Sequence, residues 1–371
     1  MANIPDMLKN LGLMALSLAA LLLAGEGLLR LLPVNEGLGA RPVNEAQPVL
    51  RFEPGALRTW STGWDMALAN RLRVNNEGFV NTQDYDPAAP GPLVAVVGDS
   101  YVEAAMVPPA ETLHARLAQE LKGRARVYSF AASGAPLSQY LVYAAHARDR
   151  FHPERAVVVV VGNDFDESLL RYKASPGFHY FRKGPGGQAE LVRVDYAPGG
   201  LRALARHSRL ALYLVNNLGV GSLTQRLGAA RAGKGAFVGQ TAAAADRDRL
   251  DGSLFAIDAF VELLPGAFGL PPERILLVLD APRPDLYDPA ALEKARSSYF
   301  GLMRSALEER AVAAGIRVAD LQGPFLRDYA EHGQRFEFER DAHWNGRGHG
   351  LAARAVLESG LLEGLGQEAR P

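Results

Sequence analysis

A serine and a histidine with a nearby carboxylate are the residues of this chain best suited to acyl chemistry. Ser100 closes the tripeptide Gly98-Asp99-Ser100 after an apolar run, and His343 stands two residues after Asp341. A carboxylate at that spacing can accept a hydrogen bond from one imidazole nitrogen, which leaves the other nitrogen basic. The histidine can then take the proton of the serine hydroxyl, which is unreactive at its own pKa. This pattern predicts Ser100 as nucleophile, His343 as base and Asp341 as the carboxylate of a triad.

Two other positions are suited to stabilising negative charge. Gly134 follows the apolar run 126–130, and its missing Cβ lets the backbone amide approach a ligand closely. Asn163 follows the run 156–161, and its side-chain amide can donate to a developing oxyanion. Each residue alone also fits an ordinary turn or a helix cap. Only their joint occurrence with Ser100 at successive strand ends indicates a functional site.

The elements that would position these residues alternate between strands and helices. Strands are expected at five short apolar runs: 93–97, 126–130, 156–161, 275–279 and 316–319. Amphipathic stretches predict helices near 110–122, 137–150, 290–314 and 348–359. Continuous β-branched runs alternating with such helices are typical of a parallel sheet covered on both faces. Ligands bind beyond the carboxyl ends of such strands, which is where the tripeptides GDS, ASG and GND stand.

The amino-terminal segment has a separate character. Residues 11–25 carry no charge, and the apolar stretch reaches position 33 if Glu26 and Arg30 pair across one helical turn. About 20 residues are needed to cross a bilayer. We interpret residues 1–33 as an uncleaved signal anchor; a cleaved signal peptide is the alternative, although the cleavage pattern before Gly25 is poor. Lys9 favours a cytoplasmic amino terminus, which would place the rest of the chain outside the cytoplasm.

The remaining chain divides into two predicted parts. Residues 34–92 form an irregular connector rich in Pro, Gly and Asn, and residues 93–371 form the catalytic domain. An insertion over 165–270, with a hairpin and a helix near 201–218, interrupts the alternation of strands and helices. An insertion beside strand ends is predicted to act as a lid or to recognise substrate.

Composition excludes several classes of protein. The chain has no cysteine, which removes disulfides, thiolate catalysis and cysteine-ligated metals. Its net charge of -1 gives no general electrostatic case for nucleic-acid binding. No P-loop, H-E-x-x-H or G-x-S-x-G motif is present, and no G-x-G-x-x-G follows a strand. We therefore expect no metal, no cofactor and no nucleic-acid partner.

The order of Ser100, Gly134, Asn163 and His343 resembles the SGNH hydrolase superfamily, also called the GDSL esterases. The resemblance covers roughly residues 93–359 and implies a three-layer, flavodoxin-like α/β/α fold. It also implies an oxyanion hole made by the amides of Ser100 and Gly134 and the side chain of Asn163.

The chain departs from the family pattern in two ways. Tyr101 replaces the usual leucine, which we expect to change little. The last block reads D-x-H instead of D-x-x-H, with Arg340 at the usual acid position, so Glu337 and Glu339 are alternatives to Asp341. The shorter spacing is similar to membrane-tethered relatives that modify extracytoplasmic polysaccharides. His349, which would lie at the start of the last helix, is interpreted as structural.

These features together predict an esterase that removes acyl groups, O-acetyl above all, from an envelope or exported polysaccharide. The expected partners are an acylated glycan, the membrane through residues 11–33, and proteins of polysaccharide biosynthesis; the expected compartment is the periplasm if the source is a Gram-negative bacterium. Three alternatives stay open: an O-acetyltransferase, a non-catalytic domain that binds a glycan or a partner, and a flavodoxin-like cofactor binder.

Overall fold

The computed structural model describes residues 4–200, 206–220, 245–283 and 285–366. The chain forms two structural units. Unit 1 contains Met1–Leu38, Leu57–Leu72 and Pro198–Gly235, and unit 2 contains Gly39–Ala56, Arg73–Ala197 and Ala236–Pro371. All the residues predicted to carry chemistry belong to unit 2.

A five-stranded parallel sheet forms the centre of unit 2. Its strands lie in the order β4 (Arg126–Ala131), β3 (Leu93–Gly98), β5 (Arg155–Val160), β8 (Ile275–Leu279), β9 (Arg317–Asp320). All residues of β3, β5 and β8 are buried. This accounts for their continuous apolar sequences, because both faces of the sheet are covered. The five predicted strands and their parallel arrangement are confirmed.

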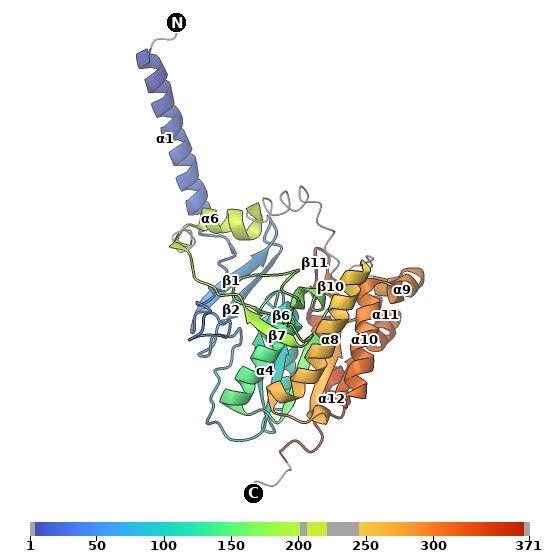
Figure 1. Ribbon diagram of the computed structural model, residues 1–371. Helices are drawn as coiled ribbons and strands as arrows, with labels where there is room; N and C mark the ends of the chain where they lie inside the picture. Colours follow the sequence, from blue (N-terminus) through green and yellow to red (C-terminus); the bar gives the residue numbers. More distant parts are fainter. Residues whose placement is uncertain (1–3, 201–205, 221–244, 284, 367–371) are drawn as a thin grey trace. The chain divides into compact units, whose positions relative to one another are not determined.

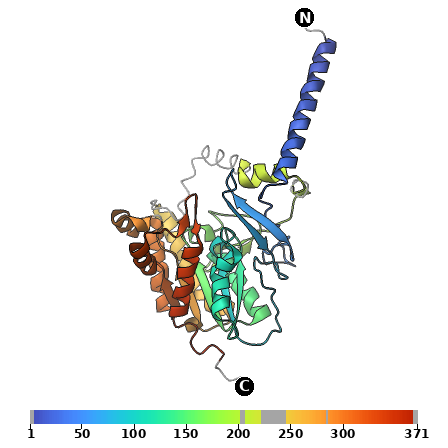
Figure 2. The ribbon, with the colours of Figure 1, turned by 180° about the vertical axis from the view of Figure 1, so that it is seen from behind.

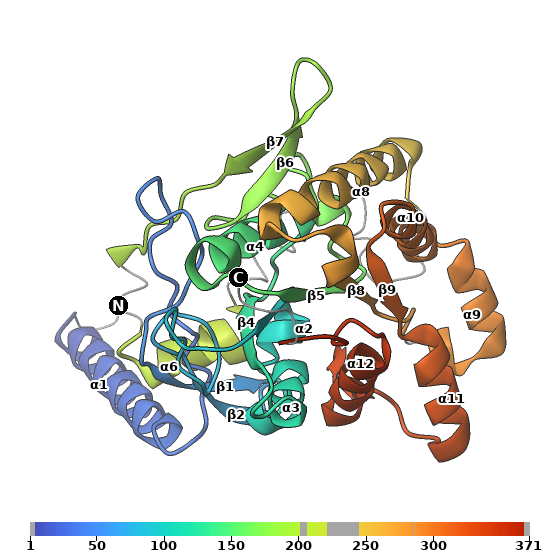
Figure 3. The same cartoon turned by 90° about the horizontal axis from the view of Figure 1, so that it is seen from below.

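Helices cover the sheet on both sides (Figure 3). One face carries α4 (Leu137–Phe151), α8 (Arg247–Phe268) and α10 (Tyr299–Ala313). The opposite face, turned toward the viewer in Figure 2, carries α3 (Leu113–Glu120), α11 (Gln322–His332) and α12 (Gly346–Glu358). The predicted three-layer α/β/α fold is therefore confirmed.

Several helix boundaries differ from the sequence prediction, among them the start of α3 (Leu113–Glu120), which was expected near residue 110. The single helix expected over 290–314 is two helices, α9 (Pro289–Arg296) and α10, because Ser298 accepts a hydrogen bond from the Gly301 amide and starts a new helix. The last helix begins at Gly346, two residues earlier than predicted, because the Asn345 side chain caps it.

The segment predicted as an insertion contains a separate hairpin and a helix that belongs to the layered core. The expected hairpin is present as β6 (His179–Lys183) and β7 (Ala189–Arg193), whereas α8 packs against α4 and α10 and completes one layer of the fold. The predicted helix over 201–218 lies partly outside the described residues; α6 (Arg209–Leu212) and the π-helical turn Tyr213–Asn217 form its second half. The predicted lid role of this insertion stays a prediction.

Unit 1 begins with the apolar helix α1 (Ile4–Leu29), which is long and apolar enough to cross a membrane. Its last turn contacts α6, which lies across its C-terminal end (Figure 1). Glu26 and Arg30 pair as predicted, at 3.0 Å. Glu26 also accepts hydrogen bonds from the Ser208 hydroxyl and from the amides of Arg209 and Leu210, so it caps the start of α6.

The remaining elements are short. Two strands, β1 (Leu57–Thr62) and β2 (Leu68–Arg73), form a separate ladder, and a second two-stranded ladder consists of β10 (Glu337–Phe338) and β11 (Asp341–Trp344). Single helical turns lie at α2 (Ser100–Glu103), Pro109–Glu111, Asp166–Ser168, Pro272–Arg274 and Asp285–Tyr287.

Candidate active site

Ser100 stands at a sharp transition from strand to helix. Strand β3 ends at Gly98, and α2 begins at Ser100, with Asp99 capping it by accepting from the Tyr101 amide at 2.9 Å. A Cβ on Gly98 would lie 2.5 Å from a methyl carbon of Val102, so only glycine lets the new helix pack this close to the strand end. The transition fixes the Ser100 side chain, of which only a small part stays exposed.

His343 and Asp341 reach Ser100 from strand β11, far away in the sequence. The His343 Nε2 atom lies 2.8 Å from Ser100 Oγ, and its Nδ1 atom lies 2.5 Å from Asp341 Oδ1. The same carboxylate oxygen accepts from the His343 backbone amide at 2.9 Å. The structure therefore brings these three predicted residues into one continuous chain of hydrogen bonds.

The electrostatics of this chain favour a basic Nε2 atom. Burial alone would raise the pKa of Asp341, but the hydrogen bonds and charge of His343 outweigh it and hold that pKa below its usual value. An ionised Asp341 accepts the Nδ1 proton, which leaves the Nε2 lone pair free for the Ser100 hydroxyl. Asp99 also lies within 3.2 Å of Ser100 Oγ, but one hydroxyl proton can serve only one acceptor at a time.

The strand that carries His343 is held by a buried arginine. Arg283 is 4% exposed; its guanidinium donates to the Ala342 carbonyl at 2.8 Å, to Asp280 at 2.7 Å and to the Tyr101 hydroxyl at 3.0 Å. Trp344 donates to the same Asp280 carboxylate at 2.8 Å. The residues on both sides of His343 are thus tied to the end of β8.

The sequence reasoning missed most of this support. Asp280 directly follows the strand 275–279, which could have singled it out, but no local signal shows that Arg283 is buried against it. The expectation that Tyr101 changes little was wrong, because its hydroxyl donates to the Ala342 carbonyl at 3.1 Å and a leucine could not.

Gly134 and Asn163 stand beside Ser100 by virtue of strand order. Strand β3 lies between β4 and β5, with Gly98 opposite Ala131 and Val97 opposite Val158, so the turns that follow these strands meet at one edge of the sheet. Gly134 has φ +81°, a conformation that favours glycine. Within the described part of the chain, the amides of Ser100 and Gly134 donate to no other group. Both amides are therefore available to a ligand.

The Asn163 side-chain amide, unlike these two backbone amides, already has a hydrogen-bond partner. Its side-chain nitrogen lies 3.4 Å from Glu167 Oε2, a long hydrogen bond that leaves donor capacity for another acceptor. No direct hydrogen bond joins Ser100 to Gly134 or Asn163 among the described residues. These two residues are neighbours of the triad at the sheet edge and not members of its hydrogen-bond chain.

Glu103 is a buried acid that sequence reasoning did not single out. From α2 it accepts hydrogen bonds from the Ser133 amide at 3.0 Å and the Ser133 hydroxyl at 2.5 Å, directly before Gly134. Burial raises the pKa of Glu103 to about 7, and the nearby Asp99 charge acts in the same direction. This carboxyl ties the helix of Ser100 to the turn of Gly134.

The other predicted candidates lie outside the triad. The His349 ring accepts from the Leu113 amide at 3.2 Å, and burial lowers its pKa to about 3, which agrees with the structural interpretation. Of the alternative acids, Glu337 pairs with Arg283 and the Tyr287 hydroxyl, and Glu339 is exposed. Asp341 is the carboxylate that contacts His343.

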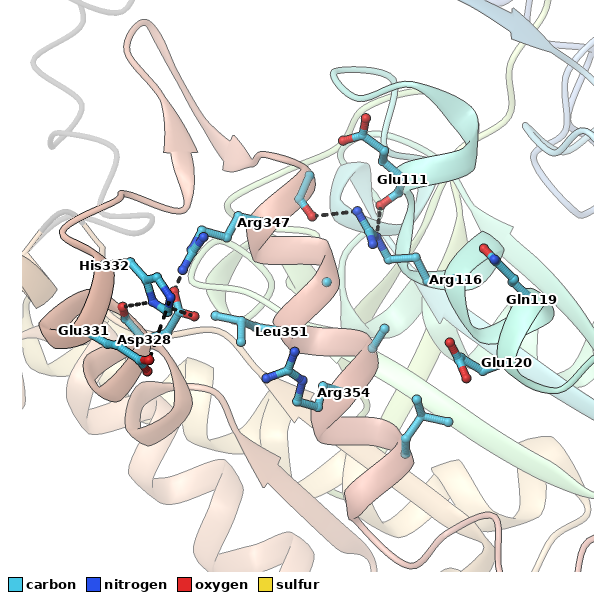
Figure 4. A pocket seen from close by; sticks show the side chains of 14 residues that line it. Glu111, Arg116, Gln119, Glu120, Asp328, Glu331, His332, Arg347, Leu351 and Arg354 are labelled. Carbon is cyan, nitrogen blue, oxygen red and sulfur yellow. Dashed lines mark hydrogen bonds and ion pairs between the residues drawn. The ribbon is translucent and has the colours of Figure 1, made fainter.

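A groove between α3, α11 and α12 lies apart from this site (Figure 4). It has a volume of about 1180 Å³, and charged side chains of both signs line it, including Arg116, Glu120 and Arg354. Neither Ser100 nor His343 lines it. Among the described residues, no group of three or more His, Asp or Glu side chains is placed to hold a metal ion.

Comparison with known proteins gives matches among solved structures only. No family model matches the sequence, and no curated protein matches it. A member of the lipolytic G-D-S-L family from Veillonella parvula is 11% identical, covering 72% of this chain and 96% of that chain, with a TM-score of 0.35. The G-D-S-L family is the one that the sequence blocks resemble.

Two similar structures are esterases of acetylated polysaccharides by name. The acetyl xylan esterase AlAXEase is 13% identical, with 71% of this chain and 98% of that chain covered and a TM-score of 0.40. A two-domain esterase active on acetylated mannans is 10% identical, with 77% and 52% covered and a TM-score of 0.38.

The contact between Asp341 and His343 predicts a large effect of Asp341→Asn. The new side-chain amide would donate to Nδ1, or it would leave His343 without an anionic partner. The imidazole would then adopt the wrong tautomer, and kcat should fall by about 10⁴-fold with the fold intact. Ester hydrolysis measured beside Glu339→Gln, an exposed control acid, would test this. Equal rates for the two variants would show that Asp341 does not orient His343.

Glu103 predicts a specific pH dependence of stability. Because its folded pKa of about 7 lies above the ordinary 4.5, the folded state binds more protons between these values, and this group's contribution to stability falls as pH rises through that window. We expect Glu103→Gln to gain about 2–3 kcal/mol in unfolding free energy relative to wild type between pH 5 and pH 8. Urea denaturation of both proteins at the two pH values measures it, and parallel changes would contradict the assignment.

Proposed function

We propose that this chain is a serine esterase of the SGNH type in which Ser100 is the nucleophile, His343 the general base and Asp341 the orienting carboxylate. The observation that carries the proposal is the continuous hydrogen-bond chain from Asp341 through His343 to Ser100. Its distances are those that general-base catalysis requires, about 2.6–3.2 Å between nucleophile and base.

The reaction follows from the positions of these groups. As Ser100 Oγ attacks the ester carbonyl carbon, its proton passes to His343 Nε2, and the carbonyl oxygen becomes an oxyanion that the amides of Ser100 and Gly134 and the Asn163 side chain can receive. His343 then gives its proton to the departing alcohol, which leaves an acyl-enzyme. Attack by water, with its proton passing to His343, forms a second tetrahedral intermediate. When this collapses, Ser100 regains its proton and the free acid is released.

We propose O-acetyl groups of an envelope or exported polysaccharide as the substrate. The D-x-H spacing of the last block, similar to that of membrane-tethered relatives acting on such polymers, supports this class. So does an apolar amino-terminal helix suited to holding the enzyme at a membrane. Transfer of the acetyl group to a glycan hydroxyl is the second candidate, since the same acyl-enzyme would serve both reactions.

Replacing the nucleophile tests the proposal directly. Ser100→Ala should remove labelling by a fluorophosphonate probe and lower hydrolysis of a small acetyl ester by on the order of 10⁴-fold or more, because Ser100 is the hydroxyl that His343 contacts. Labelling and turnover that are the same in wild type and Ser100→Ala would rule out Ser100 as the nucleophile. A wild type with neither labelling nor turnover would favour a non-catalytic binding domain. Product analysis with an acetylated glycan, water and a glycan acceptor would separate hydrolysis from transfer.

We also propose that α1 is retained as a membrane anchor. The apolar side chains along it are exposed, as expected of a helix that requires lipid and not protein as its surroundings. The helix also continues past the poor cleavage pattern before Gly25, and its last turn belongs to a folded cluster of Leu29, Val34 and Leu212. A cut before Gly25 would leave Glu26, the cap of α6, one residue from a new and mobile chain end.

A retained anchor makes a prediction about the mature protein. The full-length mass should be found in the membrane fraction and should stay there after an alkaline carbonate wash, because a single apolar helix of this length inserts stably. A mature protein that starts near Gly25, or that the wash releases, would instead identify α1 as a cleaved signal peptide.

A further inference from the structure

An ion pair outside the triad contacts two of the three residues predicted to supply oxyanion donors. The Lys173 ammonium donates to the Gly134 carbonyl at 2.8 Å and forms a close ion pair with Glu167 Oε2. The same Glu167 oxygen accepts from the Asn163 side-chain amide. Lys173 and Glu167 therefore connect the turn after β4 to the turn after β5, on either side of Ser100.

Both members of this pair lie largely inside the protein. The Lys173 side chain is 19% exposed and the Glu167 side chain 15% exposed. Removing two charges from water costs free energy that their attraction repays only when further hydrogen bonds satisfy them. Here those hydrogen bonds go to the Gly134 carbonyl and the Asn163 amide, both of which belong to the predicted oxyanion hole.

The approach of the ammonium to Gly134 is close. A Cβ built on Gly134 would lie 3.6 Å from the Lys173 nitrogen, so the charge is within contact distance of the backbone that presents the amide. On the other side of this turn, Glu103 binds the amide and hydroxyl of Ser133. The turn is thus held by the Glu103 carboxyl group at Ser133 and by the Lys173 ammonium at Gly134.

From these contacts we propose that Lys173 and Glu167 are positioning residues of the oxyanion hole. Their ion pair fixes the Gly134 amide and the Asn163 side chain at the spacing that a tetrahedral intermediate requires, and the inference rests on the esterase function proposed above. Preorganised donors act mainly on the transition state, because they need not reorganise when the charge develops. The pair therefore affects kcat and leaves the binding of the neutral ester nearly unchanged.

Lys173→Met and Glu167→Gln test this, with p-nitrophenyl acetate as the neutral ester. We expect kcat to fall by roughly 10–100-fold in Lys173→Met while KM changes by less than about threefold, a smaller loss than the 10²–10³ that removing a direct donor causes. Lys173→Arg, which keeps the charge and the donors, should retain kcat within about fivefold. Lys183→Met, an exposed lysine on the hairpin of the same insertion, is the matched control and should behave as wild type.

Two further measurements exclude a merely structural effect. Titration of active sites with a fluorophosphonate refers kcat to folded enzyme, so partial unfolding cannot imitate the result. Affinity for a boronic acid that forms a tetrahedral anion on Ser100 should fall in parallel with kcat in Lys173→Met, whereas affinity for a neutral amide analogue of the substrate should not.

The outcomes separate this inference from the function on which it rests. If wild type hydrolyses the ester in a Ser100-dependent manner and Lys173→Met has the same kcat per active site, the positioning role is overturned and the esterase stands. The same conclusion follows if KM alone changes, or if the charge-preserving Lys173→Arg is as impaired as Lys173→Met. If wild type shows no Ser100-dependent hydrolysis, the esterase proposal and this inference both fail.

Discussion

The parallel alignment of β4, β3 and β5 is the constraint on which the site depends. Parallel strands in register end at the same edge, and here the central strand of the three carries the serine while its neighbours carry Gly134 and Asn163. The sheet itself is held by apolar burial on both faces, so the positions of these turns are a product of core packing. Chemistry enters only where the strands stop, because the buried strands offer no free polar group to a ligand.

His343 is brought to this edge by different interactions. His343 lies on a short two-stranded ladder whose Trp344 packs into the main core. Charged groups hold this strand as well: Asp280 at the end of β8, Arg283 beside it, and the contacts of both with Tyr101, Ala342 and Trp344. A buried arginine is favourable only when its donors are satisfied, and here the acceptors are parts of the site. Apolar packing therefore places Ser100, whereas His343 is held both by the packing of Trp344 and by a polar network.

Sequence reasoning succeeded where a residue's role follows from its neighbours in the chain. The β-branched runs specified the strands, and residues directly after them, such as Ser100, could be recognised because strand ends in such sheets converge. It failed for Glu103, Lys173 and Arg283, whose roles arise from burial and from partners on other elements. The identity of a charged residue does not show whether its side chain is exposed to water or buried against a partner. The break between α9 and α10 was missed for a related reason: a serine within a helical pattern shows its cap only when the following turn is known.

The strand that carries Asp341 and His343 explains why their spacing is short. Side chains two apart on a strand project from the same face, so an acid at that distance meets the imidazole without any turn between them. One additional residue would send the carboxylate to the opposite face. A search template that requires two residues between acid and base encodes one backbone conformation along with the chemistry. Such a template would pass over this chain, although a continuous hydrogen-bond chain from acid to serine is assembled here.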